Sequence, residues 1–365
     1  MPAFKDFKGR EVIRRVRAFL GRGQSDPRSG DIRGMPDGAE RSDPRAQELA
    51  EARQKLVRKN REISKLRAQL AQRSPGARDY GINPENIIWI FGTGRSGSTW
   101  LSNMMGEIEN HARWNEPLVG ALLGYFYYER AGHRADKGGK NFILGRRYKD
   151  TWVGPMRDLV LGGAAARFPE LAEGGYVVIK EPNGSVGAPL LMEILPESRM
   201  ILLVRDPRDV VASSIDSRKE GSWRYQRRQR IGDTKVEEEA EKIVREASQF
   251  VHIRAEGYVQ AIGNAKLAYD AHRGPKALVR YEDLVADTTG TMRRLYAALE
   301  IEVNPAELAK VVEKHSWENV PEEEKGEGKF YRKGRPGSWR EDLTQEQARM
   351  VEEITASLLK KFYAG

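Results

Sequence analysis

The chain has 365 residues, of which 39% are hydrophobic and 32% charged, enough for one large domain with extensions, and no apolar run reaches the about 18 residues that a membrane span needs. Cysteine is absent, which excludes disulfides, thiolate nucleophiles and cysteine-held metals, and the five histidines show no metal-ligand spacing, so we expect a cytoplasmic protein without a metal. The net charge of +9 comes from residues 1–80, which hold 20 Lys/Arg and 11 Asp/Glu. The rest of the chain holds 42 basic and 42 acidic residues. Because the body has no excess of positive charge, no nucleic-acid partner is expected.

Residues 1–45 are predicted to form a basic amphipathic helix followed by a flexible linker. Within residues 4–20 the apolar residues recur at helical spacing: Val12, Ile13, Val16, Phe19 and Leu20. Such a helix could lie on an anionic membrane, which would place the protein peripherally at the inner face of the membrane, or it could dock on the body of the protein. Gly, Pro, Asp and Ser dominate residues 21–45, which is typical of a linker.

Residues 46–75 are predicted to be helical. Four apolar residues fall seven apart: Leu49, Leu56, Ile63 and Leu70. This heptad pattern over residues 46–73 could join two copies of the chain as a short coiled coil and so form a homodimer. A single charged helix fits the pattern equally well.

The sequence pattern of residues 84–365 is typical of an α/β domain. Four buried strands are predicted, IIWIF at 87–91, YVVIK at 176–180, MILLV at 200–204 and ALVRY at 277–281. Helical stretches separate them, which indicates a parallel β-sheet flanked by helices.

A glycine-rich loop follows the first strand and reads GTGRSGST from Gly92 to Thr99. It leads into a helical stretch that begins with Trp100. Backbone N–H groups and the helix dipole favour an anion at such a junction. Hydroxyl groups of Ser98 and Thr99 and the charge of Arg95 add to this preference.

Two widespread nucleotide motifs fit the loop incompletely. A Walker A loop of a kinase or NTPase needs a lysine where Ser98 stands. A dinucleotide-binding fingerprint matches Gly92, Gly94 and Gly97, but it needs an acid at the end of the second strand, and Glu116 lies in an Asn-Glu-Pro turn.

Two more basic stretches stand farther along the chain. Arg205 ends the third strand, and Ser213 follows eight residues later on the next helix, although Arg205 could instead pair with Asp209. The third stretch, FYRKGRPGSWR at 330–340, reads as a basic loop. A guanidinium and a hydroxyl near a helix start suit phosphate.

All three stretches are similar to motifs of the sulfotransferases. RSGSTW at 95–100 resembles their 5′-phosphosulfate loop, although cytosolic members carry lysine where this chain has Arg95. Arg205 with Ser213 resembles their 3′-phosphate site, and RKGRPGSW at 332–339 resembles their C-terminal Arg-Lys-Gly motif. The chain thus resembles bacterial-type sulfotransferases with a P-loop-like fold, and RYEDL at 280–284 is similar too, which we interpret as structural.

The resemblance implies 3′-phosphoadenosine 5′-phosphosulfate (PAPS) as the sulfuryl donor, an acceptor hydroxyl and no metal. It implies that the donor is bound by Arg95, Ser96, Gly97, Ser98, Thr99, Trp100, Arg205, Ser213, Ser316, Trp317, Arg332, Lys333 and Gly334. Trp100 and Trp317 would stack near the adenine, although each could simply be a core aromatic.

Sulfuryl transfer needs cations at the leaving phosphate and a base at the acceptor hydroxyl. Arg95 and Lys180 are the candidate cations. Cytosolic members carry Lys-Thr-His where this chain has Lys180-Glu181-Pro182, so the usual histidine is missing. Glu116 is the first candidate base, Glu181 the second and His111 a distant third, while Glu116 could also be a solvent-exposed turn residue.

The acceptor is not specified by any motif. Residues 121–152 are dense in aromatic and cationic side chains, which suits a carbohydrate acceptor and equally suits a solvated surface. A catalytically dead nucleotide-binding scaffold, recruited by the N-terminal helices, is the alternative that is not an enzyme.

Overall fold

The structure, a computed structural model, describes Lys59, residues 79–125, Tyr127 and residues 143–145, 148–171 and 174–363. Apart from Lys59, the predicted units 1–45 and 46–75 therefore lie outside the described residues. Membrane contact through residues 4–20 and a homodimer through residues 46–73 stay predictions. Within the described ranges, no helix is long and apolar enough to cross a membrane, and no group of three or more His, Asp or Glu side chains is placed to hold a metal ion.

A five-stranded parallel sheet forms the centre of the molecule, in the order β2-β3-β1-β4-β5. Its strands are β1 (Ile87–Phe91), β2 (His111–Asn115), β3 (Tyr176–Lys180), β4 (Arg199–Val204) and β5 (Lys276–Arg280). The predicted α/β fold with a parallel sheet is confirmed, and the four predicted strands are present with bounds that agree within one residue.

Sequence reasoning missed β2, which lies at an edge of the sheet. Its sequence, HARWN, alternates between half-buried and exposed side chains and contains no apolar run. An edge strand that is covered on one side only does not need the continuous apolar pattern of a central strand. β2 lies between the first helix and Glu116, which follows this strand directly.

Alternate residues of the strands pack into two separate cores on the two faces of the sheet. Ile88 and Ile90 of β1 face one core, and Trp89 and Phe91 face the other. All five residues of β1 are fully buried, and each buried side chain of this size stabilises the fold by about 1.5–3 kcal/mol. The apolar runs of the sequence therefore mark the strands because both faces are covered.

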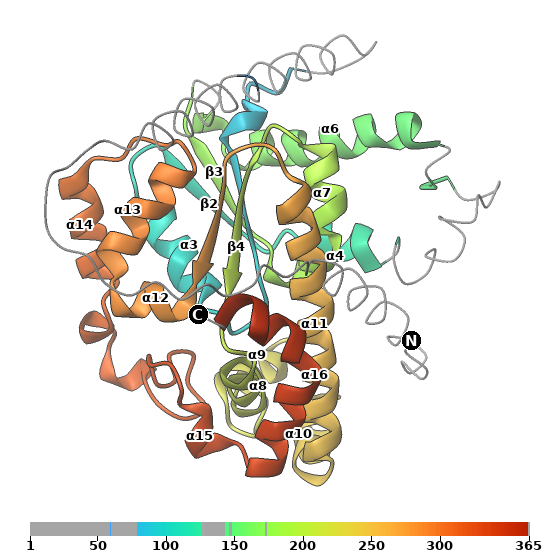
Figure 1. Ribbon diagram of the computed structural model, residues 1–365, viewed down its shortest axis with the longest axis vertical. Helices are drawn as coiled ribbons and strands as arrows, with labels where there is room; N and C mark the ends of the chain where they lie inside the picture. The colour runs from blue at the N-terminus through green and yellow to red at the C-terminus, as the bar shows by residue number, and fades with distance from the viewer. Residues whose placement is uncertain are drawn as a thin grey trace, which may run out of the picture.

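Helices cover both faces of the sheet, as Figure 1 shows. One face is covered by α3 (Ser98–Gly106), α12 (Tyr281–Ala286), α13 (Thr288–Ala298) and α14 (Pro305–Lys314). The other is covered by α6 (Lys149–Arg167), α7 (Ala188–Ile194), α11 (Ala247–Ala271) and α16 (Gln345–Tyr363). Near the carboxyl ends of the strands lie α4 (Val119–Gly124), α8 (Pro207–Asp216), α9 (Trp223–Arg230), α10 (Val236–Arg245) and α15 (Trp339–Asp342). The described 3₁₀ helices are Pro84–Asn86, Pro169–Leu171, Pro182–Gly187, Trp317–Asn319 and Glu322–Glu324.

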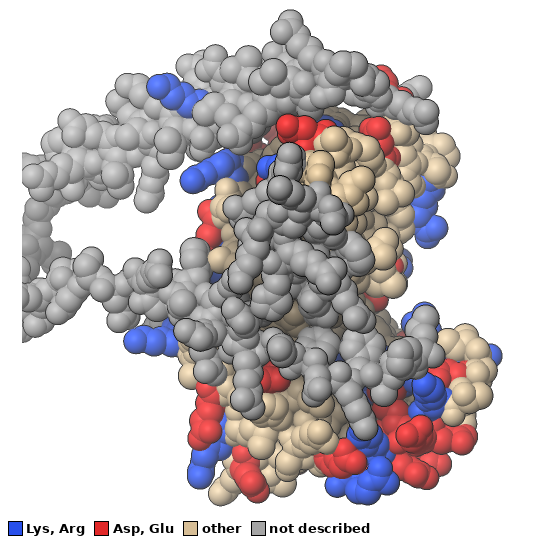
Figure 2. All heavy atoms as spheres, turned by 90° about the vertical axis from the view of Figure 1, so that its right-hand side faces the viewer, with Lys and Arg blue, Asp and Glu red and all other residues tan. Residues whose placement is uncertain are grey.

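The charges of the described residues are mixed on the face that Figure 2 presents. Lys and Arg lie among Asp and Glu there, without a large area of one sign. This agrees with the equal numbers of acidic and basic residues after residue 80. Because opposite charges are interspersed on this face, their electric fields largely cancel at distances beyond the Debye length of about 8 Å.

Glu181 follows β3 and is buried where that strand meets α4. Its Oε1 accepts a hydrogen bond from the backbone N–H of Val119 at 2.9 Å, and its other oxygen packs so closely on Gly184 that no side chain would fit there. Burial raises the pKa of Glu181 to about 7, the hydrogen bond from Val119 opposes this shift and the charge of Glu116 adds to it. The carboxyl group thus joins the ends of two elements in the interior.

We expect Glu181→Gln to remove a pH dependence of stability. A carboxyl group whose pKa is higher in the folded than in the unfolded chain holds extra protons when folded, so its contribution is greatest at low pH and falls as the pH rises through about 7. Between about pH 5 and pH 8 the free energy of unfolding of the wild type should fall by about 2–3 kcal/mol relative to the variant. Urea unfolding followed by circular dichroism measures this difference.

The exposed Glu170 supplies the control. Glu170→Gln should leave the pH profile of the wild type unchanged. Parallel profiles for the wild type and Glu181→Gln would show that Glu181 is ionised in the folded protein throughout this range.

Candidate active site

The glycine-rich loop joins β1 to α3 and presents the amino end of that helix. Gly97 caps the helix with a φ of 88°. A Cβ at Gly97 would lie 2.6 Å from the ring of Tyr281, so both the backbone angle and the contact require glycine. The N–H groups at the start of α3 are therefore held against the end of β5, and they favour an anion.

One pocket of about 520 Å³ brings the three predicted stretches together. The phosphate loop contributes Arg95, Gly97, Ser98, Thr99 and Trp100. The second stretch contributes Arg205 and Ser213, and the C-terminal stretch contributes Arg332, Lys333 and Gly334. Segments more than 230 residues apart thus meet in one cavity, as the hydrogen bond from Nη2 of Arg95 to the carbonyl of Phe330 shows directly (2.9 Å).

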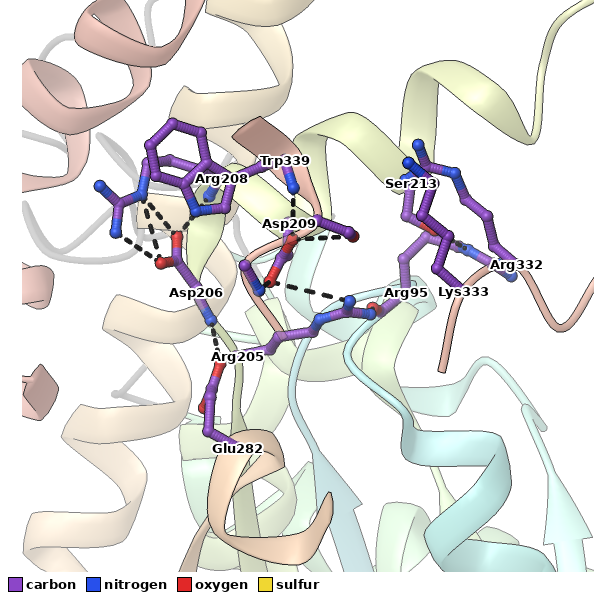
Figure 3. A network of polar contacts seen from close by, with 12 residues as sticks. Arg95, Arg205, Asp206, Arg208, Asp209, Ser213, Glu282, Arg332, Lys333 and Trp339 are labelled. Carbon is purple, nitrogen blue, oxygen red and sulfur yellow. Dashed lines mark hydrogen bonds and ion pairs between the residues drawn. The ribbon is translucent and has the colours of Figure 1, made fainter. Parts of the chain in front are cut away.

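Arg95, Arg205 and Arg332 contribute to the positive charge of this pocket (Figure 3). Nε of Arg95 donates to Oγ of Ser213 at 3.0 Å, and Nη1 of Arg205 donates to the carbonyl of Arg95 at 3.0 Å. Burial, followed by the charge of Arg205, lowers the pKa of Arg95 to about 10, and Arg332 acts in the same direction. Nε of Arg205 is buried without a hydrogen-bond acceptor among the described residues. The pocket therefore favours a polyanion.

A buried carboxylate holds the C-terminal stretch beside α8. Asp209 accepts hydrogen bonds from the backbone N–H groups of Gly337 (2.7 Å) and Trp339 (2.9 Å) and from the hydroxyl of Ser338 (3.2 Å). The carboxylate is fully buried and lies 3.9 Å from Nη2 of Arg205. Asp209 therefore anchors the loop that carries Arg332 and Lys333, and its contact with Arg205 is long.

The basic residues of that loop pair with nearby carboxylates. Nε of Arg332 lies 3.5 Å from Asp216, and its guanidinium also contacts Asp342. Nζ of Lys333 lies 2.7 Å from Glu341 and 3.0 Å from Asp342. A phosphate at this end of the pocket would compete with these carboxylates for the same N–H groups.

Aromatic side chains also line the pocket. The indole N–H of Trp100 donates to the carbonyl of His315 at 2.8 Å, and its ring meets Tyr281 edge-on. Gly334, with a φ of 61°, packs so closely against the ring of Trp317 that any side chain there would clash. Ser316 is part of the lining too. A flat aromatic base fits between such surfaces.

Glu116 and Lys180 form an ion pair beside the phosphate loop. Nζ of Lys180 lies 2.6 Å from Oε1 of Glu116 and donates to Oγ1 of Thr99 at 3.1 Å. Asn183 donates to Oε2 of Glu116 at 2.8 Å. The pair forms because Asn115 and Lys180 are opposite each other in the β2–β3 ladder. Lys180 is nearly buried, whereas 29% of the Glu116 side chain is exposed.

The backbone is strained next to this pair. Arg95 and Glu116 have φ values of 73° and 51°, which non-glycine residues rarely adopt. Leu118 has a φ of 62° as well. Such residues cost of order 1–3 kcal/mol each and cluster at functional sites.

Five predicted residues are not part of the pocket lining, and two of them, Glu116 and Lys180, form the ion pair beside the phosphate loop. Ser96 is fully buried behind the loop and is not part of the lining. Glu181 is enclosed by α4 and Gly184 rather than directed at the pocket. His111 begins β2 and therefore lies at the amino end of the strand that Glu116 follows, about 16 Å away along an extended chain. Its ring stacks on Tyr176, and burial lowers its pKa.

Sequence reasoning also overlooked pocket residues. Tyr281 lies in the RYEDL stretch that was interpreted as structural, yet its ring lies 4.2 Å from the guanidinium of Arg205 and lines the pocket. Asp209 was considered only as a partner of Arg205. No local signal in the sequence shows that it binds the loop at 337–339, because that contact spans 128–130 residues.

The sheet order decides against the dinucleotide-binding interpretation of the loop. In that fold the second strand lies next to the first. Here β3 and β4 flank β1, and β2 lies at the edge. The Walker A interpretation lacks its lysine, because Ser98 occupies that position as the first residue of α3.

Comparisons with solved structures return distant similarities. The chain shares 15% identity with mouse sulfotransferase SULT7A1 complexed with PAP (TM-score 0.46; 76% of this chain and 85% of that chain covered). It shares 18% identity with the sulfotransferase domain of the Synechococcus PCC 7002 olefin synthase (TM-score 0.42; 77% and 98% covered). It shares 13% identity with sulfotransferase STF9 from Mycobacterium avium (TM-score 0.45; 98% of both chains covered).

The family itself is established by sequence. No curated protein matches the chain. A profile of the sulfotransferase family matches residues 87–305, more than half of the chain, and ends before the stretch at 330–340 that completes the pocket. The protein therefore belongs to the sulfotransferase family.

Proposed function

We propose that this protein transfers a sulfuryl group from PAPS to the hydroxyl of an acceptor. The observation that carries the proposal is the 520 Å³ pocket in which four arginines and a lysine from three separate segments converge. A donor with phosphates at both the 5′ and 3′ positions matches two groups of cations at one cavity. A nucleoside triphosphate has no 3′-phosphate, so a kinase or NTPase would not need the second group of cations.

In this proposal the start of α3 binds the 5′-phosphosulfate. Backbone N–H groups at Gly97 and Ser98, the hydroxyl of Thr99 and the guanidinium of Arg95 surround it. Arg205, Ser213, Arg332 and Lys333 bind the 3′-phosphate, with the backbone of Gly334 beside them. Trp100, Ser316 and Trp317 contact the adenine. Ser96 supports the loop from behind.

Lys180 and Arg95 then stabilise the charge that develops on the leaving phosphate. Glu116 takes the proton of the acceptor hydroxyl as that oxygen attacks sulfur, while the bond from sulfur to the donor's bridging oxygen breaks. The pair with Lys180 and the hydrogen bond from Asn183 orient the carboxylate. A carbohydrate remains one candidate acceptor.

The cofactor assignment predicts a preference for 3′-phosphoadenosine 5′-phosphate over 5′-AMP. Charge-assisted contacts of about 1.5–3 kcal/mol each should make the affinity at least about tenfold higher. Arg205→Met should remove most of this preference, because a buried guanidinium is lost. Calorimetric titration of the full-length protein measures both affinities.

The exposed Arg245 on α10 is the matched control. Arg245→Met should leave both affinities as in the wild type. Equal affinities of the wild type for the two nucleotides would refute the 3′-phosphate site.

The assignment of the base predicts that Glu116→Gln slows transfer by about a hundredfold or more. Glutamine keeps the size of the side chain and one of its two acceptor oxygens, and Glu116 is not part of the lining of the donor pocket, so donor affinity should stay within a few-fold. The assay follows labelled sulfate from PAPS into the best acceptor found by screening glycans, lipids and small phenols. Glu109→Gln, at the other end of β2, should transfer normally.

Two results would count against Glu116. Transfer near the wild-type rate in Glu116→Gln would exclude it as the base. Loss of transfer in Glu181→Gln, with that variant still folded, would assign the proton transfer to Glu181 instead.

The anchoring of the basic loop predicts a selective effect of Asp209→Asn. Asparagine has one acceptor oxygen, whereas the two carboxylate oxygens of Asp209 accept from two N–H groups and one O–H group. Misplacing the loop should lower the affinity for 3′-phosphoadenosine 5′-phosphate by about tenfold and change that for 5′-AMP little. Calorimetry of both nucleotides separates this effect from general destabilisation.

Ser338→Ala is the companion variant, since it removes the longest of the three hydrogen bonds and keeps both backbone contacts. Its affinities should stay within about threefold of the wild type. An equal loss of affinity for both nucleotides in Asp209→Asn would mean that the carboxylate supports the whole pocket rather than the loop.

A further inference from the structure

A second group of arginines lies outside the lining of the donor pocket. We define the arginine cluster as Arg218, just after α8, Arg224 on α9 and Arg254 on α11. The guanidinium of Arg218 lies 5.6 Å from the ring of Phe250, which is one helical turn from Arg254 on the same side of α11. Burial, followed by the charges of Arg254 and Arg224, lowers the pKa of Arg218 to about 9.

In the described part of the chain, the one carboxylate that forms an ion pair with the arginine cluster is already engaged. Glu239 lies 3.6 Å from Nε of Arg218 and also contacts Arg228. Arg224 lies one turn from Arg228 on the same side of α9 but has no ion pair or hydrogen bond with any residue in the described part of the chain. The same holds for Arg254.

Three N–H donors of this region are buried and lack an acceptor among the described residues. They are Nε of Arg224, Nε of Arg254 and the indole N–H of Trp223. Leaving such donors unpaired costs about 1–3 kcal/mol each, more for charged groups. Arg224 also lies in the first turn of α9, where the helix dipole disfavours a cation and favours an anion.

The cluster borders the reacting groups. Trp223, next to Arg224, packs against Phe330 at 5.1 Å, and the guanidinium of Arg95 lies 5.5 Å from the Trp223 ring. The charge of Glu116 acts on the pKa of Arg224, and that of Arg95 on the pKa of Arg218. The cluster is therefore close to the site of transfer without being part of the donor pocket.

We propose that the arginine cluster binds an anionic group of the acceptor, so that the acceptor is a hydroxyl compound that also carries a carboxylate, phosphate or sulfate. Guanidinium groups bind all three through paired hydrogen bonds. The transfer step is unchanged: the acceptor oxygen bonds to sulfur, the bond to the donor phosphate breaks, the proton passes to Glu116, and the anionic group only orients the acceptor. This inference rests on the proposed function and names the class of its acceptor.

Full-length protein saturated with 3′-phosphoadenosine 5′-phosphate provides the test, with probes that differ only in charge. The first pair is 4-nitrophenyl β-glucuronide and 4-nitrophenyl β-glucoside, and the second is glycerol 3-phosphate and glycerol. Calorimetry should show that at least one anionic probe binds at least about tenfold more tightly than its neutral partner. The pair that discriminates shows whether a carboxylate or a phosphate is preferred.

Arg224→Met and Arg254→Met should each reduce this preference by about tenfold. The exposed Arg230, also on α9, is the control, and Arg230→Met should keep the preference. All variants should keep wild-type affinity for 3′-phosphoadenosine 5′-phosphate. If the wild type itself does not bind 3′-phosphoadenosine 5′-phosphate, the proposed function is refuted. The same probe pairs titrated into nucleotide-free protein then test the arginine cluster separately.

Three results would overturn the inference. The first is that neither pair discriminates, which includes the case in which no anionic probe binds. The second is that Arg224→Met and Arg254→Met discriminate as well as the wild type. The third is that these variants lose affinity for PAPS but not for 3′-phosphoadenosine 5′-phosphate, which would assign the cluster to the sulfuryl group of the donor.

Discussion

The buried carboxylate of Asp209 links the middle of the chain to its C-terminal part. It binds two backbone N–H groups and one hydroxyl of residues 337–339 and lies near Arg205. A buried charge is stable only when such partners surround it. The loop that carries Arg332 and Lys333 therefore has one position relative to α8, and α8 begins only three residues after the end of β4. The sheet thus sets the geometry of the pocket through this contact.

Parallel pairing has the same effect on the reacting groups. β2 and β3 run side by side, so that Glu116 and Lys180 emerge together at the carboxyl edge of the sheet. β1 lies next to β3 and delivers the phosphate loop to the same edge. Connections between parallel strands cross over outside the sheet, which leaves this edge free for a site. The strained backbone at Arg95 and Glu116 is tolerated because the packed strands hold both ends of these turns.

Two groups of cations flank the pair of Glu116 and Lys180. Arg95, Arg205 and Arg332 face the donor pocket, where Asp216 and Asp342 partly balance them. Among the residues that the structure describes, the arginine cluster forms one ion pair with a carboxylate, between Arg218 and Glu239. Unbalanced buried charge lowers the stability of a fold unless a bound anion compensates it. In the proposed function, an anionic donor would compensate the first group and an anionic acceptor the second.

The sequence by itself determined the fold class and the donor motifs. Fully buried strands are continuous apolar runs. The glycine loop, Arg205 and the RKG stretch can be recognised from the spacing of their residues along the chain alone. Only the tertiary structure decided which residues contact these motifs. The edge strand β2 has no apolar run, the hydrogen bonds of Asp209 span 128–130 residues, and the burial of Glu181 depends on a glycine three positions later that packs on it. Arg224 and Arg254 read as ordinary charged helix residues, because whether a guanidinium has a partner is a property of packing between helices and not of spacing along one.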